Sequence, residues 1–132
     1  GIKLVEEWRQ GAHAYLGVTV SGFPNLFMLY GPNTNLGHNS ILVMIEAQVG
    51  YIIDAIRQLD ARKARRLDVK RDVMDEYNRW LQRDLAKSVW AADKQSWYKL
   101  ADGTITNNWP HSTIRYRRLL RVADLAAYDT AD

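Results

Sequence analysis

The chain has 132 residues and no cysteine, which suits one domain with its own core, excludes disulfide bonds and thiolate chemistry, and fits a reducing compartment. Hydrophobic residues make up 47% and charged residues 25%, as in an ordinary globular protein, and the net charge of +3 does not by itself call for a nucleic-acid partner. No apolar run approaches the roughly 18 residues of a membrane span, so we expect a cytoplasmic protein without a membrane partner.

The first thirty residues end in the most strand-like segment of the chain. Residues 1–20 mix short strand-like pieces with Gly11 and Gly17, and residues 21–25 predict a turn, because glycine permits unusual dihedrals and proline fixes φ. Residues 26–30, with the sequence LFMLY, then form an unbroken apolar run bounded by turn signals. This pattern is typical of a strand buried on both faces, as in a parallel sheet.

A long helix is predicted after the small and polar residues 31–40. It begins near Asn39 or Ser40, both good N-caps, and continues to about Leu59. We expect it to be mostly buried, because its polar positions fall close to one narrow stripe. These positions are Glu46, Gly50, Asp54, Arg57 and Gln58. Glycine at position 50 costs about 1 kcal/mol against alanine in a helix interior, which we explain by close packing against a neighbouring element.

The second half of the chain contains a second helix and an aromatic C-terminal region. Basic residues cluster at 62–66, and apolar side chains recur at spacings of three and four within residues 69–86, which predicts an amphipathic, half-exposed helix. From residue 89 aromatic and polar residues alternate irregularly, and Asp102-Gly103 is a hairpin signal. Residues 115–121 are basic again, and we expect the tail that follows to be partly loose.

Together these elements predict an α+β fold. It consists of one buried strand, a long buried helix, a second amphipathic helix and a C-terminal β-hairpin region. A self-sufficient α/β domain contains several strands that alternate with helices, whereas this chain shows a single buried strand. We therefore interpret the chain as part of a larger protein, whose remainder supplies the neighbouring strands.

The polar segment 31–40 is the best candidate for a functional site. The first amides of a helix lack internal partners and the helix dipole places partial positive charge there, so a polarised ligand oxygen is a natural occupant. Side-chain donors and acceptors surround this helix end: Asn33, Thr34, Asn35, His38, Asn39 and Ser40. The alternative interpretation is a capped helix that follows a long polar loop. The three histidines are too scattered for a recognisable metal site.

The phrases GFPNLF, GPNTNLGHNS and IEAQ follow one another within residues 22–48, and SWY, Gly103 and WP follow in the C-terminal region. This combination closely resembles the C-terminal part of class B flavoprotein monooxygenases, which include the Baeyer–Villiger monooxygenases. Two positions depart from the family pattern: residues 92–95 replace the usual Gly-Cys before SWY, and His111 replaces the usual glycine after WP. The family's GxGxxG and FxGxxxHTxxWP motifs are absent here and lie upstream in such enzymes. The resemblance therefore implies a C-terminal fragment of an α/β enzyme with two dinucleotide-binding domains.

The resemblance also implies roles for particular residues. The segment 26–30 would close the FAD domain and deliver the next residues to the flavin ring, where the helix N-terminus would face the pyrimidine carbonyl. The implied cofactor-binding residues are Gly31, Pro32, Asn33, His38, Asn39 and Ser40, with Trp97 approaching the nicotinamide coenzyme. The implied substrate-pocket residues are Thr34, Asn35 and Leu36. No catalytic residue and no metal site is expected in this chain.

The implied activity is that of an NADPH- and FAD-dependent monooxygenase, in which a C4a-peroxyflavin oxygenates a ketone, amine or sulfide. Residues 1–60 would form the closing part of the FAD-binding domain, 61–90 a helical segment, and 91–132 a β-rich C-terminal cover. FAD, NADP and a small organic substrate would bind only together with the upstream domains of the same polypeptide. We therefore expect the isolated chain to be inactive and to form a homo-oligomer through surfaces meant for those domains.

Two alternatives remain open at this point. The basic segments 62–71 and 115–121 could bind an acidic protein partner or, less in keeping with the mild net charge, nucleic acid, with the aromatic residues merely structural. Alternatively, the family assignment holds but the segment serves only as an assembly surface without activity. Salt-sensitive binding to nucleic acid would favour the first alternative, whereas flavin bound together with the upstream region would favour the monooxygenase.

Overall fold

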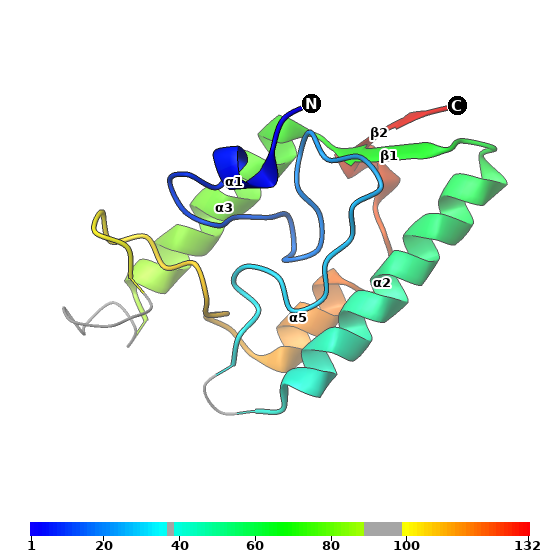
Figure 1. Ribbon diagram of the computed structural model, residues 1–132. Coiled ribbons are helices and arrows are strands. Elements are labelled where there is room, and N and C mark those ends of the chain that lie inside the picture. The colour runs from blue at the N-terminus through cyan, green and yellow to red at the C-terminus, as the bar shows by residue number, and fades with distance from the viewer. Residues whose placement is uncertain (37–38, 89–98) are drawn as a thin grey trace.

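The computed structural model describes residues 1–36, 39–88 and 99–132 of the chain (Figure 1). Along the chain its elements are α1 (Leu4–Glu7), α2 (Ile41–Ala61), β1 (Arg66–Val69), α3 (Arg71–Ala86), α5 (Thr113–Leu119), the 3₁₀-helix η1 (Leu125–Ala127) and β2 (Tyr128–Ala131). Figure 1 shows the coil that precedes α2 lying between the two long helices, α2 and α3. This coil carries Val18 and Val20, which are fully buried, so it forms the middle of the core.

Helix α2 begins where the sequence predicts. Ser40 is its N-cap, because the Ser40 backbone is extended and its Oγ accepts a hydrogen bond from the amide of Leu42 at 3.3 Å. The helix ends at Ala61, close to the predicted end at Leu59, and Lys63 then turns the chain with a φ of 56°. The predicted position of this helix is therefore confirmed.

The prediction that α2 is mostly buried is wrong for one of its faces. Met44, Gln48, Tyr51 and Ala55 point into the core. On another side of the helix four large apolar residues are exposed, namely Leu42 (63%), Val49 (40%), Ile53 (44%) and Ile56 (50%). We call these four residues the α2 stripe. Gly50 also faces open space, since a Cβ built there meets no atom within 4 Å, so the described residues do not supply the close packing expected at this glycine.

The strand predicted for residues 26–30 is wrong. This segment is coil, and Leu29 and Tyr30 are each 50% exposed. The amide of Met28 donates to the carbonyl oxygen of Val18 at 2.8 Å, but the sheet that the structure describes pairs only β1 with β2. A strand needs a hydrogen-bonded neighbour, and none lies beside this segment among the described residues. A half-buried coil therefore takes the place of the expected doubly buried strand.

The C-terminal tail is ordered, so the prediction of a partly loose end is wrong. Strand β2 pairs antiparallel with β1, and Tyr128 stands opposite Val69 in the register. The Tyr128 side chain is buried, and its hydroxyl lies 2.8 Å from the hydroxyl of Tyr51 on α2. The partner strand lies about sixty positions earlier in the chain, as the same pairing shows. Local sequence contains no signal for so distant a partner.

The hairpin signal at Asp102-Gly103 is confirmed as a tight turn. Lys99 and Ile105 form an antiparallel bridge around it, and the amide of Leu100 donates to Thr104 at 2.9 Å. The prediction that residues 91–132 are rich in β-structure is wrong for the described part of that region. Residues 113–119 form helix α5, and β2 (Tyr128–Ala131) is its one strand among the described residues.

Helix α5 forms because its first turn is capped and one side of it is apolar. Ser112 Oγ accepts from the amide of Arg115, and Tyr116 and Leu120, four positions apart in the chain, are both buried. The arginines of this segment, at positions 115, 117, 118 and 121, stay at the surface.

Helix α3 is amphipathic, as predicted. Met74, Leu81 and Leu85 are fully buried, whereas Arg79 and Arg83 on the other side are exposed. The predicted start at residue 69 is slightly early, because residues 66–69 belong to β1. Among the described residues, no helix is long and apolar enough to cross a membrane.

Candidate functional site

The turn at Gly31-Pro32 is held against a second turn around Gly17. A Cβ built on Gly31 would collide with the carbonyl oxygen of Gly17, and a Cβ on Gly17 would collide with the side chain of Thr34. Gly17 also has a φ of 70°, a conformation that favours glycine. These two glycines therefore allow the two turns to touch, and the close approach that the sequence predicts at Gly31 is made to this chain's own backbone.

Two residues with left-handed backbone flank the Gly31-Pro32 pair: Tyr30 has a φ of 55° and Asn33 a φ of 58°. Asparagine tolerates this conformation, whereas it is uncommon for tyrosine. The buried Asn33 side chain donates from Nδ2 to the carbonyl oxygens of Ile105 at 2.7 Å and Asn108 at 3.1 Å. Asn33 thus braces the turn on the segment 105–108, and both of its amide hydrogens are directed at this chain.

The three predicted substrate-pocket residues differ in exposure. Thr34 is fully buried, and its Oγ1 donates to the carbonyl oxygen of Gly31 at 2.7 Å. Asn35 is partly exposed, accepts from the Tyr30 hydroxyl at 2.8 Å, and donates to Asn108 Oδ1 at 3.2 Å. Leu36 is half-buried against the core. Only Asn35 and Leu36 therefore retain surface that a ligand could contact.

The N-terminus of α2 is exposed, and the side chains of Asn39 and Ser40 accept hydrogen bonds from backbone amides there. Asn39 Oδ1 accepts from the amide of Ser40 at 2.9 Å, and Ser40 in turn caps Leu42. Both side chains are exposed, as a binding role requires. The predicted cofactor-binding residues His38 and Trp97 lie outside the residues that the structure describes.

Gly31 and Pro32 line a groove of about 340 Å³ together with Trp8, Met28 and Tyr30. The groove offers flat apolar surfaces, and Trp8 is held in place because its Nε1 donates to the carbonyl oxygen of His13 at 2.8 Å. Such a surface suits the edge of a planar aromatic ligand. Sequence reasoning missed Trp8 and Met28, since neither occupies a recognisable spacing to the turn.

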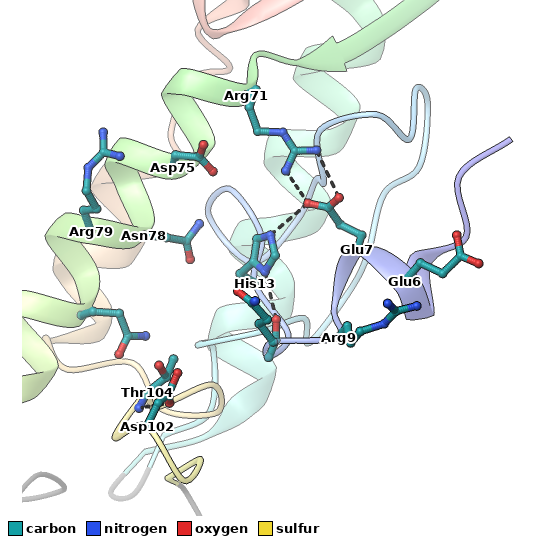
Figure 2. Close-up of a pocket in the computed structure, with 13 residues that line it drawn as sticks. Glu6, Glu7, Arg9, His13, Arg71, Asp75, Asn78, Arg79, Asp102 and Thr104 are labelled. Carbon is teal, nitrogen blue, oxygen red and sulfur yellow. Dashed lines mark hydrogen bonds and ion pairs between the residues drawn. The ribbon is translucent and has the colours of Figure 1, made fainter.

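A larger, polar cleft of about 710 Å³ lies between α1 and α3 (Figure 2). Arg71 donates from both Nη atoms to the carboxylate of Glu7. His13 places Nε2 3.2 Å from Glu7 Oε1 and Nδ1 2.9 Å from the carbonyl oxygen of Gly11. Both ring nitrogens of His13 therefore face oxygen atoms of this chain.

The charges at the centre of this cleft are directed at one another. The hydrogen bond from Arg71 holds the pKa of Glu7 below its usual range, although burial acts in the opposite direction. The lining of the cleft contains no residue of the segment 31–40. No group of three histidine, aspartate or glutamate side chains in the described part of the chain could hold a metal ion. We therefore assign the candidate site to the smaller apolar groove beside Gly31-Pro32.

In sequence, the chain is similar to curated monooxygenases. It is 45% identical over 130 residues to a Baeyer–Villiger monooxygenase of Pseudomonas aeruginosa, a match that covers 97% of this chain and 25% of that protein. It is 46% identical over 123 residues to the FAD-binding monooxygenase ktnD of Aspergillus niger, covering 89% of this chain and 20% of that protein. The chain thus spans a quarter or less of these relatives. No family model matches it.

Solved structures of monooxygenases share the fold. The oxidized steroid monooxygenase bound to NADP superposes with a TM-score of 0.82 at 26% identity, over 100% of this chain and 26% of that one. The cyclohexanone monooxygenase of Rhodococcus sp. Phi1 bound to NADP+ superposes with a TM-score of 0.81 at 24% identity, over 100% of this chain and 26% of that one. At 24% identity, the similarity to the cyclohexanone monooxygenase concerns the fold alone.

Proposed function

This chain is homologous to a C-terminal quarter of flavin-dependent monooxygenases of the Baeyer–Villiger type, and from this premise we propose that it supplies the flavin-edge turn and part of the substrate pocket of such an enzyme. The complete polypeptide would use FAD and NADPH to oxygenate a ketone, amine or sulfide. The observation that carries the proposal is the position of Gly31-Pro32 on an apolar groove, in the segment that leads to the capped start of α2 at Ser40.

The groove fits one edge of a flavin ring. Trp8, Met28 and Pro32 present flat or compact apolar surfaces of the kind on which an aromatic ring packs. When bound, the flavin supplies the redox chemistry that activates oxygen, and the protein binds, orients and excludes water. The start of α2 would stabilise negative charge on a nearby ligand oxygen, because free helix amides and the helix dipole both favour it.

The individual roles follow from burial. We assign contact with the flavin to Gly31, Pro32 and the helix start at Asn39 and Ser40, and contact with the substrate to Asn35 and Leu36. Asn33 and Thr34 are assigned as internal braces of the turn, since their side chains are buried against this chain. For His38 and Trp97 the proposed cofactor roles rest on the sequence resemblance alone.

The remainder of the polypeptide is proposed to cover the α2 stripe. A helix that is apolar on both sides is normally buried on both. The relatives are about four times as long as this chain, so the same polypeptide has ample chain to cover the stripe. In this arrangement residues 1–60 close the FAD-binding domain, 61–90 form a helical segment and 91–132 cover it. The isolated chain is then inactive, because the FAD pyrophosphate site lies elsewhere.

The proposal is tested by Pro32→Ala in the complete polypeptide. Loss of two methylene groups from the groove is expected to weaken FAD binding by up to roughly fifteenfold, at about 0.8 kcal/mol per fully buried methylene. Pro24→Ala is the matched control, since Pro24 lies in an exposed turn outside the groove. FAD dissociation constants and thermal midpoints of both variants are compared. Equal FAD affinity in the two variants would contradict the proposal.

Gly31 is a poor site for this test. Its missing side chain is explained by contact with Gly17, so a larger residue would disturb the turn whether or not a flavin binds there.

One observation favours a second candidate function, an interaction with an acidic protein. Arg117, Arg118 and Arg121 line a depression of about 350 Å³ on α5, together with the exposed Ile114. Three cations around an apolar residue suit an acidic peptide with an apolar anchor. Binding of an acidic peptide that weakens with salt and is lost in Arg118→Ala would support this function.

A further inference from the structure

Gln48 is a fully buried polar residue in the middle of α2. Glutamine is rarely buried so completely unless its amide is satisfied. Gln48 is also the last residue of the IEAQ phrase, which carries part of the family resemblance and to which neither the groove nor the core assigns a role. Its contacts therefore call for a physical explanation.

Both ends of the Gln48 amide are used. The Oε1 atom accepts a hydrogen bond from the backbone amide of Tyr30 at 2.9 Å. The Nε2 atom donates to the hydroxyl of Tyr116 at 3.0 Å, and that hydroxyl donates to the carbonyl oxygen of Leu16 at 2.6 Å. Gln48 thus connects, directly or through Tyr116 of α5, to the residues that immediately precede Gly31 and Gly17.

Leu16 and Tyr30 each have a backbone conformation that needs support. Each has a φ of 55°, and neither is a residue type that adopts this conformation readily. Such conformations persist only where the surrounding structure holds them, and they concentrate at functional sites. The buried Gln48–Tyr116 pair supplies a hydrogen bond to each of them, just before the two glycines that bring the turns into contact.

We propose that Gln48 is a positioning residue that, with Tyr116, sets the conformation of the Gly31-Pro32 turn for its ligand. The identity of that ligand as a flavin rests on the proposed function, whereas the positioning of the turn by Gln48 does not. Gln48 does not line the groove, so it acts through the backbone of Tyr30 and, by way of Tyr116, through the backbone of Leu16.

Three variants of the complete polypeptide test this role. Gln48→Met keeps the length of the side chain and removes both hydrogen bonds. Gln48→Glu restores both when protonated, because a neutral carboxyl accepts through its carbonyl oxygen and donates through its hydroxyl, whereas the carboxylate only accepts. Gln58→Met is the matched control on the same helix, since Gln58 binds Asp54 and the carbonyl oxygen of Ala123 instead of the turn.

The readouts are the hydrogen-exchange protection factor of the Tyr30 amide and the flavin absorption spectrum with its rate of reduction by NADPH. In Gln48→Met we expect the Tyr30 protection factor to fall by up to roughly tenfold and the flavin readouts to change, while Gln58→Met changes neither. Gln48→Glu should match the wild type at low pH. At high pH its carboxylate still accepts from the Tyr30 amide but no longer donates to the Tyr116 hydroxyl, so its flavin readouts should depart from those of the wild type. The midpoint should lie above the usual glutamate range because burial raises the pKa of a carboxyl.

The outcomes separate this role from the proposed function. Unchanged Tyr30 protection in Gln48→Met, or a Gln48→Glu variant without pH dependence, overturns the positioning role. Reduced protection with unchanged flavin readouts supports the geometric role and overturns the assignment of the turn to the flavin edge. If Gln48→Met fails to fold, the acid-dependent rescue in Gln48→Glu still supports or overturns the role.

Discussion

Glu7 illustrates how one side chain fixes the N-terminal segment. Its carboxylate joins α1 to Arg71 of α3 and to His13 (Figure 2). The hydrogen bond from Arg71 is the largest cause of the lowered pKa of Glu7. A folded-state pKa below the ordinary value means that the interaction stabilises the fold above that ordinary value. This stabilisation is lost as the pH falls through the lowered folded value.

Glu7→Gln should therefore destabilise the protein in a pH-dependent way. At pH 7 we expect the free energy of unfolding to fall by about 0.5–1 kcal/mol, the upper part of the range for partly exposed ion pairs. The difference from the wild type should shrink at acid pH, as the pH falls below the ordinary glutamate pKa and Glu7 itself becomes protonated. Urea unfolding at pH 7 and at acid pH measures this, and the exposed Glu6→Gln serves as control. A loss of equal size at both pH values would argue against the ion pair.

His111, one of the departures from the family pattern, also has a local explanation. Its ring stacks on Trp80 of α3 with a centroid distance of 5.4 Å. Its Nε2 lies 2.7 Å from Asp84 Oδ2, and its Nδ1 lies 3.2 Å from Arg115 Nη1. Because arginine only donates, the neutral ring carries its proton on Nε2 and donates to Asp84. A glycine here could make none of these contacts between α3 and the start of α5.

At the scale of elements, α2 is the helix on which the candidate site depends. Its N-terminus follows the segment that carries the proposed flavin-edge turn, its buried face supplies Gln48, and its α2 stripe is exposed. Gly50 lies in the helix interior, and a Cβ built on it meets no atom of the described residues within 4 Å.

Gly50→Ala is expected to stabilise the isolated chain by about 1 kcal/mol, because alanine is the better helix former and its Cβ has open space. Gly31→Ala is the contrasting variant and should destabilise it, since the new Cβ collides with the Gly17 carbonyl. Chemical denaturation of both variants measures the change. A destabilising Gly50→Ala in the complete polypeptide, beside a stabilising one in the isolated chain, would locate an interface at this glycine.

At the scale of the whole molecule, the α2 stripe leaves a large apolar surface uncovered on a chain a quarter as long as its relatives. In aqueous solution, an exposed apolar surface of this kind is normally covered by a protein partner. In the complete polypeptide we assign that partner to the remaining domains, and in the isolated chain to a second copy.

The isolated chain should therefore self-associate, and Ile53→Glu should shift it toward the monomer. A charge in the middle of the stripe removes apolar contact and would be buried without a partner. Light scattering over a range of protein concentrations measures the change. Ile114→Glu on α5 is the matched control, since Ile114 is 61% exposed and lies outside the stripe. A wild-type chain that stays monomeric at high concentration would contradict this expectation.

The sequence by itself determined the features that depend on near neighbours. The start of α2 at Ser40, the amphipathic α3 and the turn at Asp102-Gly103 each follow from capping, periodicity or turn chemistry within a few residues. The candidate turn at Gly31-Pro32 is predicted in the same way, because glycine and proline open a polar segment that ends in a helix cap at Ser40. The family resemblance then suggested what the turn contacts.

Only the tertiary structure decided the features that need a distant partner. Residues 26–30 have the composition of a buried strand, but composition does not supply a neighbouring strand, so they remain coil. The tail became a strand because β1 was available to pair with it. Gly31 against Gly17, Gln48 against Tyr30 and Glu7 against Arg71 are contacts between segments far apart in the chain. Their formation depends on how the helices and turns pack together, which no local pattern of residues specifies.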